Sequence, residues 1–227
     1  MIVVNTKRSY HIMAKNKSDA KTWLDSGLQL SNLGNTREAI KCYDKAIEID
    51  PSYDTAWFNK GTTLMRMNDV NGAIKCFSKA VEIYPTDADY YINMGMAYGA
   101  IKDYKHELDA YQKALKLDSG DNLGTLYFNL AACLGRLGMN EEALKYYTKA
   151  TEINKYDFEA YHNKGIVLIK LRQFKQALES LNKAIEIAPD PSPSAQLKNI
   201  VDAILNPANK SKQQEILSYL DIILMDI

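Results

Sequence analysis

One spacing recurs along most of this chain and constrains its fold more than any other feature. Two small residues seven positions apart, Ala39 and Ala46, return 34 residues later as Ala73 and Ala80. The same two positions are then filled by Glu107 and Ala114, by Ala143 and Ala150, and by Ala177 and Ala184. The step is 34 residues except from Ala114 to Ala150, where it is 36. A fixed period of this length indicates an architecture of stacked repeats.

Three other positions of the repeat carry the same kind of residue each time. An aromatic residue near the start is Trp23, Trp57, Tyr91, Tyr127 or Tyr161, and a small residue four positions on is Gly27, Gly61, Gly95, Ala131 or Gly165. A large residue between the paired small ones is Tyr43, Phe77, Tyr111, Tyr147 or Leu181. Residues three, four and seven apart share one face of a helix, so each repeat predicts two short helices that pack closely. Proline ends three of the repeats, because it cannot continue a helix.

These residues resemble the signature of the tetratricopeptide repeat (TPR) family, in which a period of about 34 residues carries a Trp, Gly, Tyr, Ala, Phe, Ala, Pro pattern. Five repeats follow in register: 20–53, 54–87, 88–121, 124–157 and 158–191. The resemblance implies an all-α, right-handed superhelical solenoid of antiparallel helix pairs, whose first helices line a concave groove. We expect the turn of each pair at Gly34–Asn35, Asn68–Asp69, Lys102–Asp103, Gly138–Met139 and Arg172–Gln173.

The segments outside the repeats differ from them. Residues 1–19 lack the repeat signature, and we expect a segment that is partly mobile or packed on the first repeat, with Ser18 or Asp19 as the N-cap of the first helix. Residues 192–227 predict a capping helix over about 193–205, because the last repeat of a solenoid needs a cover. Ser211 and Gln214 form a capping-box pattern that predicts a final helix to about Asp226.

The final helix is apolar on more than one stripe, which exceeds what a one-sided cap needs. Its surplus predicts either packing within the chain or contact with a second molecule. The candidate residues of such an interface are Ile216, Tyr219, Leu220, Ile223, Leu224 and Ile227.

One repeat departs from the pattern in its core. Glu107 stands where the other repeats have alanine. Two interpretations are open: the Glu107 side chain swings outward with its stem on the surface, or the helix pair of the third repeat is splayed.

Composition excludes several classes of function. Lys+Arg and Asp+Glu number 28 each, so the net charge is zero and a general nucleic-acid binder is not expected. There is no run of about 18 apolar residues, so no membrane span is expected. Cys42, Cys76 and Cys133 are interpreted as reduced core residues of a cytoplasmic protein. The three histidines lack metal-ligand spacing, and no catalytic cluster or cofactor motif is present, so we expect neither an enzyme nor a metal or cofactor site.

The candidate binding residues lie at the sixth position of the first helices. Asparagine fills this position in four repeats, as Asn59, Asn93, Asn129 and Asn163. An asparagine side chain offers a donor and an acceptor together, so it can pair with a peptide bond whatever the ligand's side chains are. In TPR proteins that bind extended peptides, asparagine at this position does so. The alternative is that asparagine is simply the common residue at this position.

Neighbouring positions complete the predicted groove. The fifth position supplies an apolar floor, and the thirteenth position supplies cations along one side. The floor residues are Phe58, Ile92, Phe128 and His162, and the cations are Arg66, Arg136 and Lys170. The family's carboxylate clamp for chaperone tails is not expected, because of its positions in repeats one to three only Asn59 fits.

We therefore expect a non-enzymatic scaffold that binds an extended peptide or a partner's helix in the concave groove. The alternative is a structural module that self-associates, as a homodimer, through its apolar C-terminal helix.

Overall fold

The computed structural model describes residues 3–117, 120–190 and 192–225, with the side chains of residues 3–17, 121, 207 and 224–225 left aside. Every regular element in these residues is helical. The helices group into two compact units, Met1–Ser119 and Gly120–Ile227, which we call the N-terminal and the C-terminal unit.

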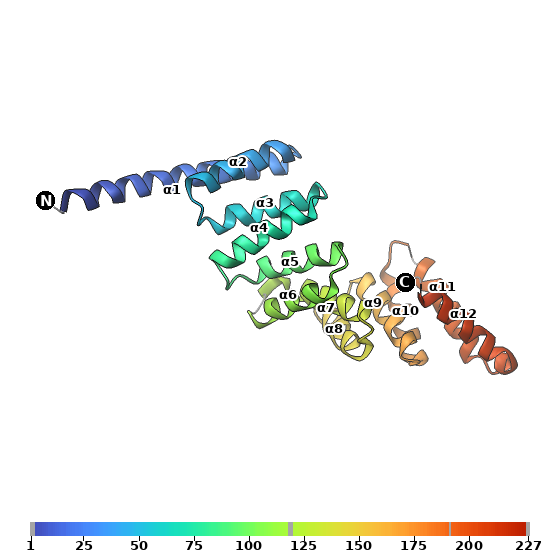
Figure 1. The fold of residues 1–227 in the computed structure, drawn as a ribbon. Helices are drawn as coiled ribbons and strands as arrows, with labels where there is room; N and C mark the ends of the chain where they lie inside the picture. Colours follow the sequence, from blue (N-terminus) through green and yellow to red (C-terminus); the bar gives the residue numbers. More distant parts are fainter. Residues whose placement is uncertain (1–2, 118–119, 191, 226–227) are drawn as a thin grey trace. The chain divides into compact units, whose positions relative to one another are not determined.

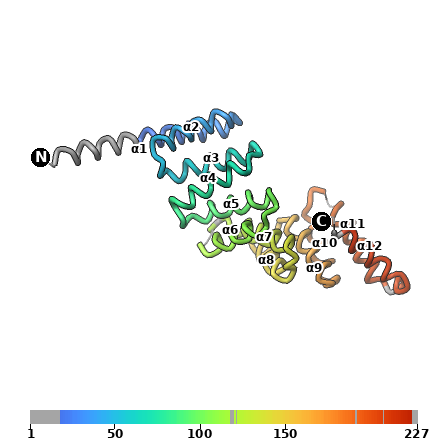
Figure 2. Tube along the Cα trace, viewed as in Figure 1, coloured from blue at the N-terminus to red at the C-terminus, as the bar shows by residue number. Residues whose placement is uncertain are grey.

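The N-terminal unit is a stack of three antiparallel helix pairs (Figure 1). The pairs are α1 (Val3–Asn32) with α2 (Thr36–Ile49), α3 (Asp54–Arg66) with α4 (Val70–Ile83), and α5 (Ala88–Ala100) with α6 (Tyr104–Lys116). Each pair also packs on the next, α2 on α3 and α4 on α5, so the elements follow one another in space as in sequence (Figure 2).

The C-terminal unit holds two further repeats and their cover. After a short 3₁₀ turn, η1 (Gly120–Asn122), the helices are α7 (Leu123–Arg136), α8 (Asn140–Ile153), α9 (Phe158–Lys170) and α10 (Phe174–Ile187). They are followed by α11 (Ser192–Leu205), the 3₁₀ segment η2 (Pro207–Lys212) and α12 (Gln213–Met225). Helix α11 packs on α10 and α9, and α12 packs on α11.

The turn inside each helix pair uses the same backbone device. One residue takes a left-handed φ at the fifteenth position of every repeat: Gly34 (79°), Asn68 (62°), Lys102 (61°), Gly138 (75°) and Arg172 (59°). A left-handed residue after a helix satisfies the last carbonyls and turns the chain back. All five predicted turns are therefore confirmed, including the two that a lysine and an arginine form without glycine.

In the three repeats of the N-terminal unit, the glycine of the first helix is required by a ring of the second. A Cβ built at Gly61 would lie 2.6 Å from Cε1 of Phe77, a distance that real side chains do not tolerate. Gly27 and Gly95 stand in the same relation to Tyr43 and Tyr111. Phe77 is fully buried, so the ring fills the space that the missing side chain leaves.

Glu107 follows neither of the two interpretations. Its side chain is only 2% exposed, so it does not swing outward, and α5 and α6 pack as closely as the other pairs. The carboxylate lies against Gly99 of α5, where a Cβ would stand 2.9 Å from Cδ of Glu107. A glycine opposite the glutamate thus provides the room that alanine gives in the other repeats.

The chain's two ends differ from the prediction in detail. Helix α1 begins at Val3 and includes the first helix of the first repeat, so Ser18 and Asp19 lie inside it and neither is its N-cap. The capping helix starts at Ser192, close to the predicted residue. The Ser211 capping box is wrong, since Ser211 lies in η2 and α12 begins at Gln213. Asn206 starts η2 by accepting from the Ala208 amide at 2.9 Å, and the 3₁₀ turns continue directly into α12.

Candidate functional site

In the N-terminal unit, two of the predicted asparagines are held by their own helices. The Asn59 side-chain amide donates to the Thr55 carbonyl at 2.8 Å, and Asn93 donates to the Asp89 carbonyl at 2.9 Å. Both side chains are half-buried. An asparagine has two N–H donors and one carbonyl acceptor, so each bond uses one N–H and fixes the orientation of the rest.

In the C-terminal unit, the other two asparagines lie on α7 and α9, and both are half-buried. The Asn163 side chain lies near the hydroxyl of Tyr147 and acts to lower the pKa of that phenol. Tyr147 is the buried large residue of α8, and its burial raises the pKa of its phenol. The repeat pattern does not indicate this contact, because it identifies Tyr147 only as the large residue between two alanines.

The predicted apolar floor is only partly accessible. Phe58 is half-buried and stacks on Tyr90 at 4.8 Å between ring centroids. Phe128 is half-buried with its ring edge to Tyr147 at 5.8 Å. Ile92 does not lie on an accessible floor, contrary to the prediction. At 5% exposure it belongs to the core of the N-terminal unit and offers no surface. The exposed apolar side chain on α5 is Met96, one turn further along, at 47%.

The predicted cations end three of the first helices. Arg66 is exposed at the end of α3, and its Nη1 donates to the Ser31 hydroxyl at 3.0 Å. Arg136 is exposed at the end of α7, where its charge opposes the rise in the pKa of Tyr147. Lys170 is half-buried at the end of α9.

A pocket of about 320 Å³ opens beside the first turns of α9 and α11. Two predicted residues, His162 and Asn163, line it. The other lining residues were not predicted from the sequence: Phe158, Glu159, Asp190, Pro193 and Ser194. The missed residues come from the first turn of α9 and from the start of the capping helix. The capping helix was predicted over about 193–205, but a repeat pattern cannot show which repeat face its residues meet.

The charges of this pocket are set by hydrogen bonding and burial. The Ser194 hydroxyl, only 4% exposed, shares a hydrogen bond of 2.8 Å with His162 Nδ1. Burial lowers the pKa of His162, which keeps the ring neutral at pH 7. Hydrogen bonds from Ser192 lower the pKa of Asp190, which keeps that carboxyl ionised. With Glu159 exposed beside them, the pocket has carboxylates but no cation among its lining residues.

A second, larger concavity of about 670 Å³ lies between α11 and α12. Of the predicted interface residues, Tyr219 is 59% exposed, whereas Ile216 and Ile223 are half-buried. The prediction of Leu220 as an interface residue is wrong, because its side chain is fully buried in the core of its own C-terminal unit. The side chains of Leu224 and Ile227 lie outside the residues that the structure describes.

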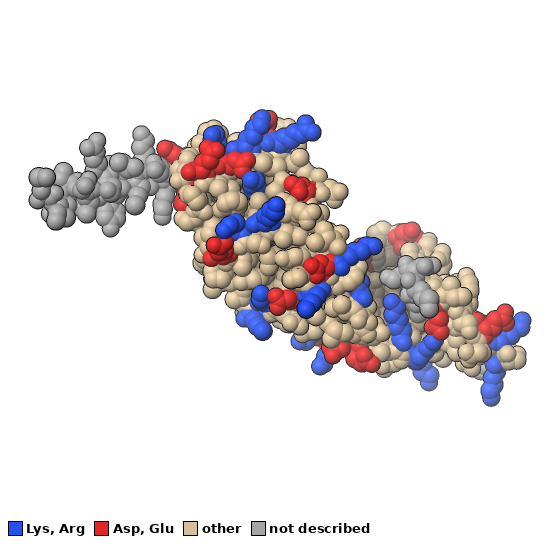
Figure 3. Space-filling view, viewed as in Figure 1, with Lys and Arg blue, Asp and Glu red and all other residues tan. Residues whose placement is uncertain are grey.

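The described part of the chain lacks the features of several other classes of site. No three His, Cys, Asp or Glu side chains there gather as a metal site would require. None of the helices described is both long enough and apolar enough to cross a membrane. On the face drawn in Figure 3, basic and acidic side chains of the described residues are interspersed.

The helix pairs with their left-handed turns and glycine–ring contacts define a TPR solenoid with capping helices. Comparison with family models agrees: "TPR repeat" matches residues 27–68, and "Tetratricopeptide repeat" models match 55–87, 88–121, 125–157 and 158–191. The chain therefore belongs to the TPR family, whose helical solenoids serve as scaffolds for protein–protein interaction.

Solved TPR structures resemble the chain over most of its length. YrrB, described as a TPR protein with an unusual peptide-binding site, is 28% identical with a TM-score of 0.72, over 82% of this chain and 95% of that one. A MamA structure is 25% identical with a TM-score of 0.68, over 74% of this chain and 91% of that one. PilF of Pseudomonas aeruginosa, 19% identical with a TM-score of 0.70 over 92% of both chains, shows the fold alone.

One curated relative is an enzyme, a UDP-N-acetylglucosamine–peptide N-acetylglucosaminyltransferase of Giardia intestinalis. The identity is 33% over 64 residues, which are 28% of this chain but only 4% of that protein. The match covers a small part of a much longer chain, so it carries no activity over.

Proposed function

We propose that the chain is a non-catalytic scaffold that binds an extended peptide segment of a protein partner on the first-helix face of its repeats. The observation that carries this proposal is the pocket on α9, because two residues selected from the repeat pattern alone, His162 and Asn163, line it. A concave pocket with apolar walls and a few polar groups is the usual form of a binding site.

The asparagines would hold the ligand through its backbone. In the N-terminal unit, the intrahelical bonds of Asn59 and Asn93 leave each side chain one N–H and its carbonyl oxygen. A peptide group presents the matching acceptor and donor. Each such pair contributes about 0.5–1.5 kcal/mol net, and none of them reads a side chain. Binding by this row is therefore modest in strength and tolerant of sequence.

The charges along α9 would add a preference for ligands with particular charged side chains. The pocket at the start of the helix has the carboxylates of Glu159 and Asp190, and the helix ends at Lys170. Phe158 and Pro193 form apolar walls against which the methylene stem of a lysine or arginine can lie. We therefore assign the pocket to a basic side chain of the ligand and the Lys170 end to an acidic one.

The similarity to YrrB supports a peptide ligand. That protein's structure is described as having a peptide-binding site, and its likeness covers most of both chains at 28% identity. The same comparison favours a scaffold over an enzyme.

The experiment uses peptides selected from a random display library against the full-length chain. Their affinity is measured by fluorescence polarisation for the wild type and for two double variants, Asn59→Ala with Asn93→Ala and Asn129→Ala with Asn163→Ala. We expect at least one of these variants to weaken binding by about tenfold, the loss expected from one to two hydrogen bonds.

The matched control replaces exposed asparagines of second helices, Asn71 on α4 and Asn182 on α10, by alanine. This control should bind like the wild type, and circular dichroism should show equal helix content in all variants. Wild-type affinity in both first-helix variants would show that the asparagines are only a feature of the repeat, and the proposed function would fail.

A further inference from the structure

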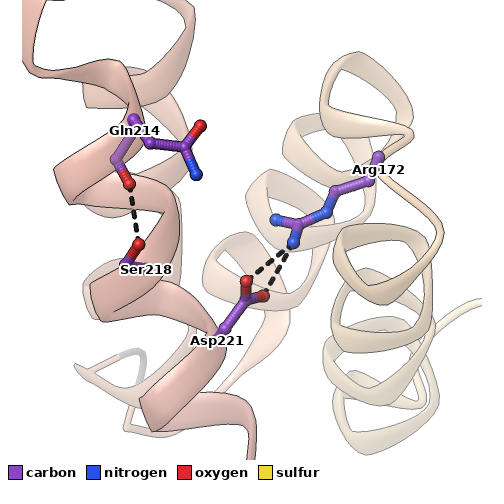
Figure 4. A network of polar contacts seen from close by, with 4 residues as sticks. All are labelled: Arg172, Gln214, Ser218 and Asp221. Carbon is purple, nitrogen blue, oxygen red and sulfur yellow. Dashed lines mark hydrogen bonds and ion pairs between the residues drawn. The ribbon is translucent and has the colours of Figure 1, made fainter.

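The orientation of α12 is fixed by its inward contacts. Leu220 is fully buried among Leu197 and Val201 of α11, and Ile216 packs against the same core. Arg172, in the turn between α9 and α10, donates from Nη2 to both carboxylate oxygens of Asp221 at 2.8 Å (Figure 4). These contacts determine which side of α12 faces away from the repeats.

The outward side of α12 carries two large, exposed apolar side chains. Tyr219 and Ile222 are 59% and 61% exposed, and Glu215 stands one turn before them. Spacings of four and three residues place these side chains in one stripe along the helix. A polar outer face keeps a capping helix soluble, and the exposed Tyr219 and Ile222 depart from this expectation.

The stripe borders the concavity of about 670 Å³ between α11 and α12. Helix α11 contributes Ile200 and Ala203 with Asn199, and α12 contributes Ile216, Tyr219 and Ile222. Two adjacent helices with an apolar groove between them accept the apolar stripe of a third helix. The occupant that fits must therefore carry apolar side chains at a spacing of three to four residues.

Helix α12 itself carries such a stripe on the same surface. Each copy therefore presents both a groove and a helix that could fill the groove of a second copy. A two-fold axis would lay α12 of each copy in the groove of the other and form a four-helix arrangement from α11 and α12 of both. The charges permit it, because the groove's two charged lining residues, Lys212 and Glu215, have opposite signs and the chain's net charge is zero. Residues of opposite sign at the groove therefore allow two copies to pair unlike charges.

A concavity on the first helix pair is a poor match for this stripe. Near Trp23, a concavity of about 390 Å³ is lined by four charged side chains: Glu38, Lys41, Asp44 and Lys45. Burying these charges against Tyr219 and Ile222 would cost free energy without supplying partners. A head-to-tail contact between copies is thus disfavoured relative to the symmetric one.

We propose that the chain forms a two-fold symmetric dimer in which α12 of each copy lies in the α11–α12 groove of the other. Tyr219, in the middle of the stripe, then lies closest to the axis. This interface uses none of the asparagines assigned to peptide binding, so its failure and the failure of the peptide proposal are distinguishable.

The first experiment measures the mass of the full-length chain by light scattering and sedimentation at high micromolar concentration. We expect a dimer for the wild type, and a dissociation constant at least about tenfold weaker for Tyr219→Asp, because truncated aromatic anchors dominate interface energies. Tyr156→Asp is the matched control, since Tyr156 is 81% exposed on the turn between α8 and α9. It should remain a dimer.

The second experiment asks whether Tyr219 meets its own copy. The native cysteines Cys42, Cys76 and Cys133 are buried, so Tyr219→Cys adds a thiol in a distinct, exposed setting. Mild oxidation should link two Tyr219→Cys chains at least about tenfold faster than two Tyr156→Cys chains, because a disulfide needs Cα atoms within about 7 Å. A monomeric wild type, a Tyr219→Asp variant that stays dimeric, or equal cross-linking rates would each overturn the proposal.

Discussion

The carboxylate of Glu107 on α6 lies directly against Gly99 on α5. A Cβ built at Gly99 would stand 2.9 Å from both Cδ and Oε1 of Glu107. The third repeat thus keeps the packing of its neighbours by exchanging sizes across the helix pair, with a larger residue on one helix and a smaller one on the other.

This relationship predicts that the effect of Gly99→Ala on the free energy of unfolding has opposite signs with and without the Glu107 carboxylate. In the wild type, Gly99→Ala forces the Glu107 side chain to move and should lower the free energy of unfolding by about 1–3 kcal/mol. In a Glu107→Ala background the clash is absent, and the same substitution should raise it by up to about 1 kcal/mol, because alanine is the better helix former. Urea denaturation measures both steps. Effects of equal sign in the two backgrounds would contradict the contact.

A second prediction concerns the glycine that meets a ring. Gly61→Ala places a methyl group 2.6 Å from Phe77 Cε1, so we expect it to destabilise the chain by about 1–3 kcal/mol. Gly135→Ala on α7 is the control, since a Cβ there meets nothing within 4 Å and should be neutral or stabilising by up to about 1 kcal/mol. Thermal unfolding compares the two. The same loss of stability in both variants would mean that the ring contact is not the cause.

The attachment of α12 gives a third prediction, about which of two neighbouring contacts is the stronger. Leu220→Ala removes a fully buried side chain and should cost about 2–5 kcal/mol of α12 docking. Asp221→Ala breaks an ion pair whose two side chains are each 46% exposed, and should cost at most about 1 kcal/mol. Hydrogen exchange of the α12 amides reports both. A larger loss of protection in Asp221→Ala than in Leu220→Ala would show that the ion pair, and not the core, holds the helix.

The pocket on α9 gives a prediction for pH. Burial lowers the pKa of His162, and the nearby Glu159 charge only partly opposes this. The unfolded chain then binds a proton at a higher pH than the folded chain, so the stability from neutral His162 is complete above the unfolded pKa and is lost as the pH falls through the folded pKa.

The variant His162→Gln removes this titration while keeping a polar group opposite Ser194. Between about pH 7 and pH 5, the free energy of unfolding of the wild type should therefore fall relative to that of the variant. Urea denaturation at several pH values measures it. A difference that stays constant over this interval would mean that the ring is not held in its neutral form.

The repeat pattern predicted most of the fold because its positions encode local geometry. The five turns and the contact between Gly61 and Phe77 follow from residue size and backbone conformation at fixed positions. The burial of Glu107 could not be predicted, because the compensating residue, Gly99, occupies a position that the repeat leaves unspecified. Ile92 was placed on the groove floor by its repeat position alone, but the packing of α5 against its neighbouring helices buries it.

The candidate site was predicted in part for the same reason. His162 and Asn163 were selected by repeat position, and they do lie in a pocket. Asp190 and Ser194 come from the capping helix, which has no repeat period, so only the three-dimensional packing of α11 on α9 could reveal them.

The central claim, that the first-helix face binds a peptide, is tested most directly by an NMR titration of the isotope-labelled full-length chain with a selected peptide. We expect the largest chemical-shift changes at the first helices, with Asn129, His162 and Asn163 of the C-terminal unit among them. Changes confined to the second helices α8 and α10, or to the α11–α12 groove, would contradict the account.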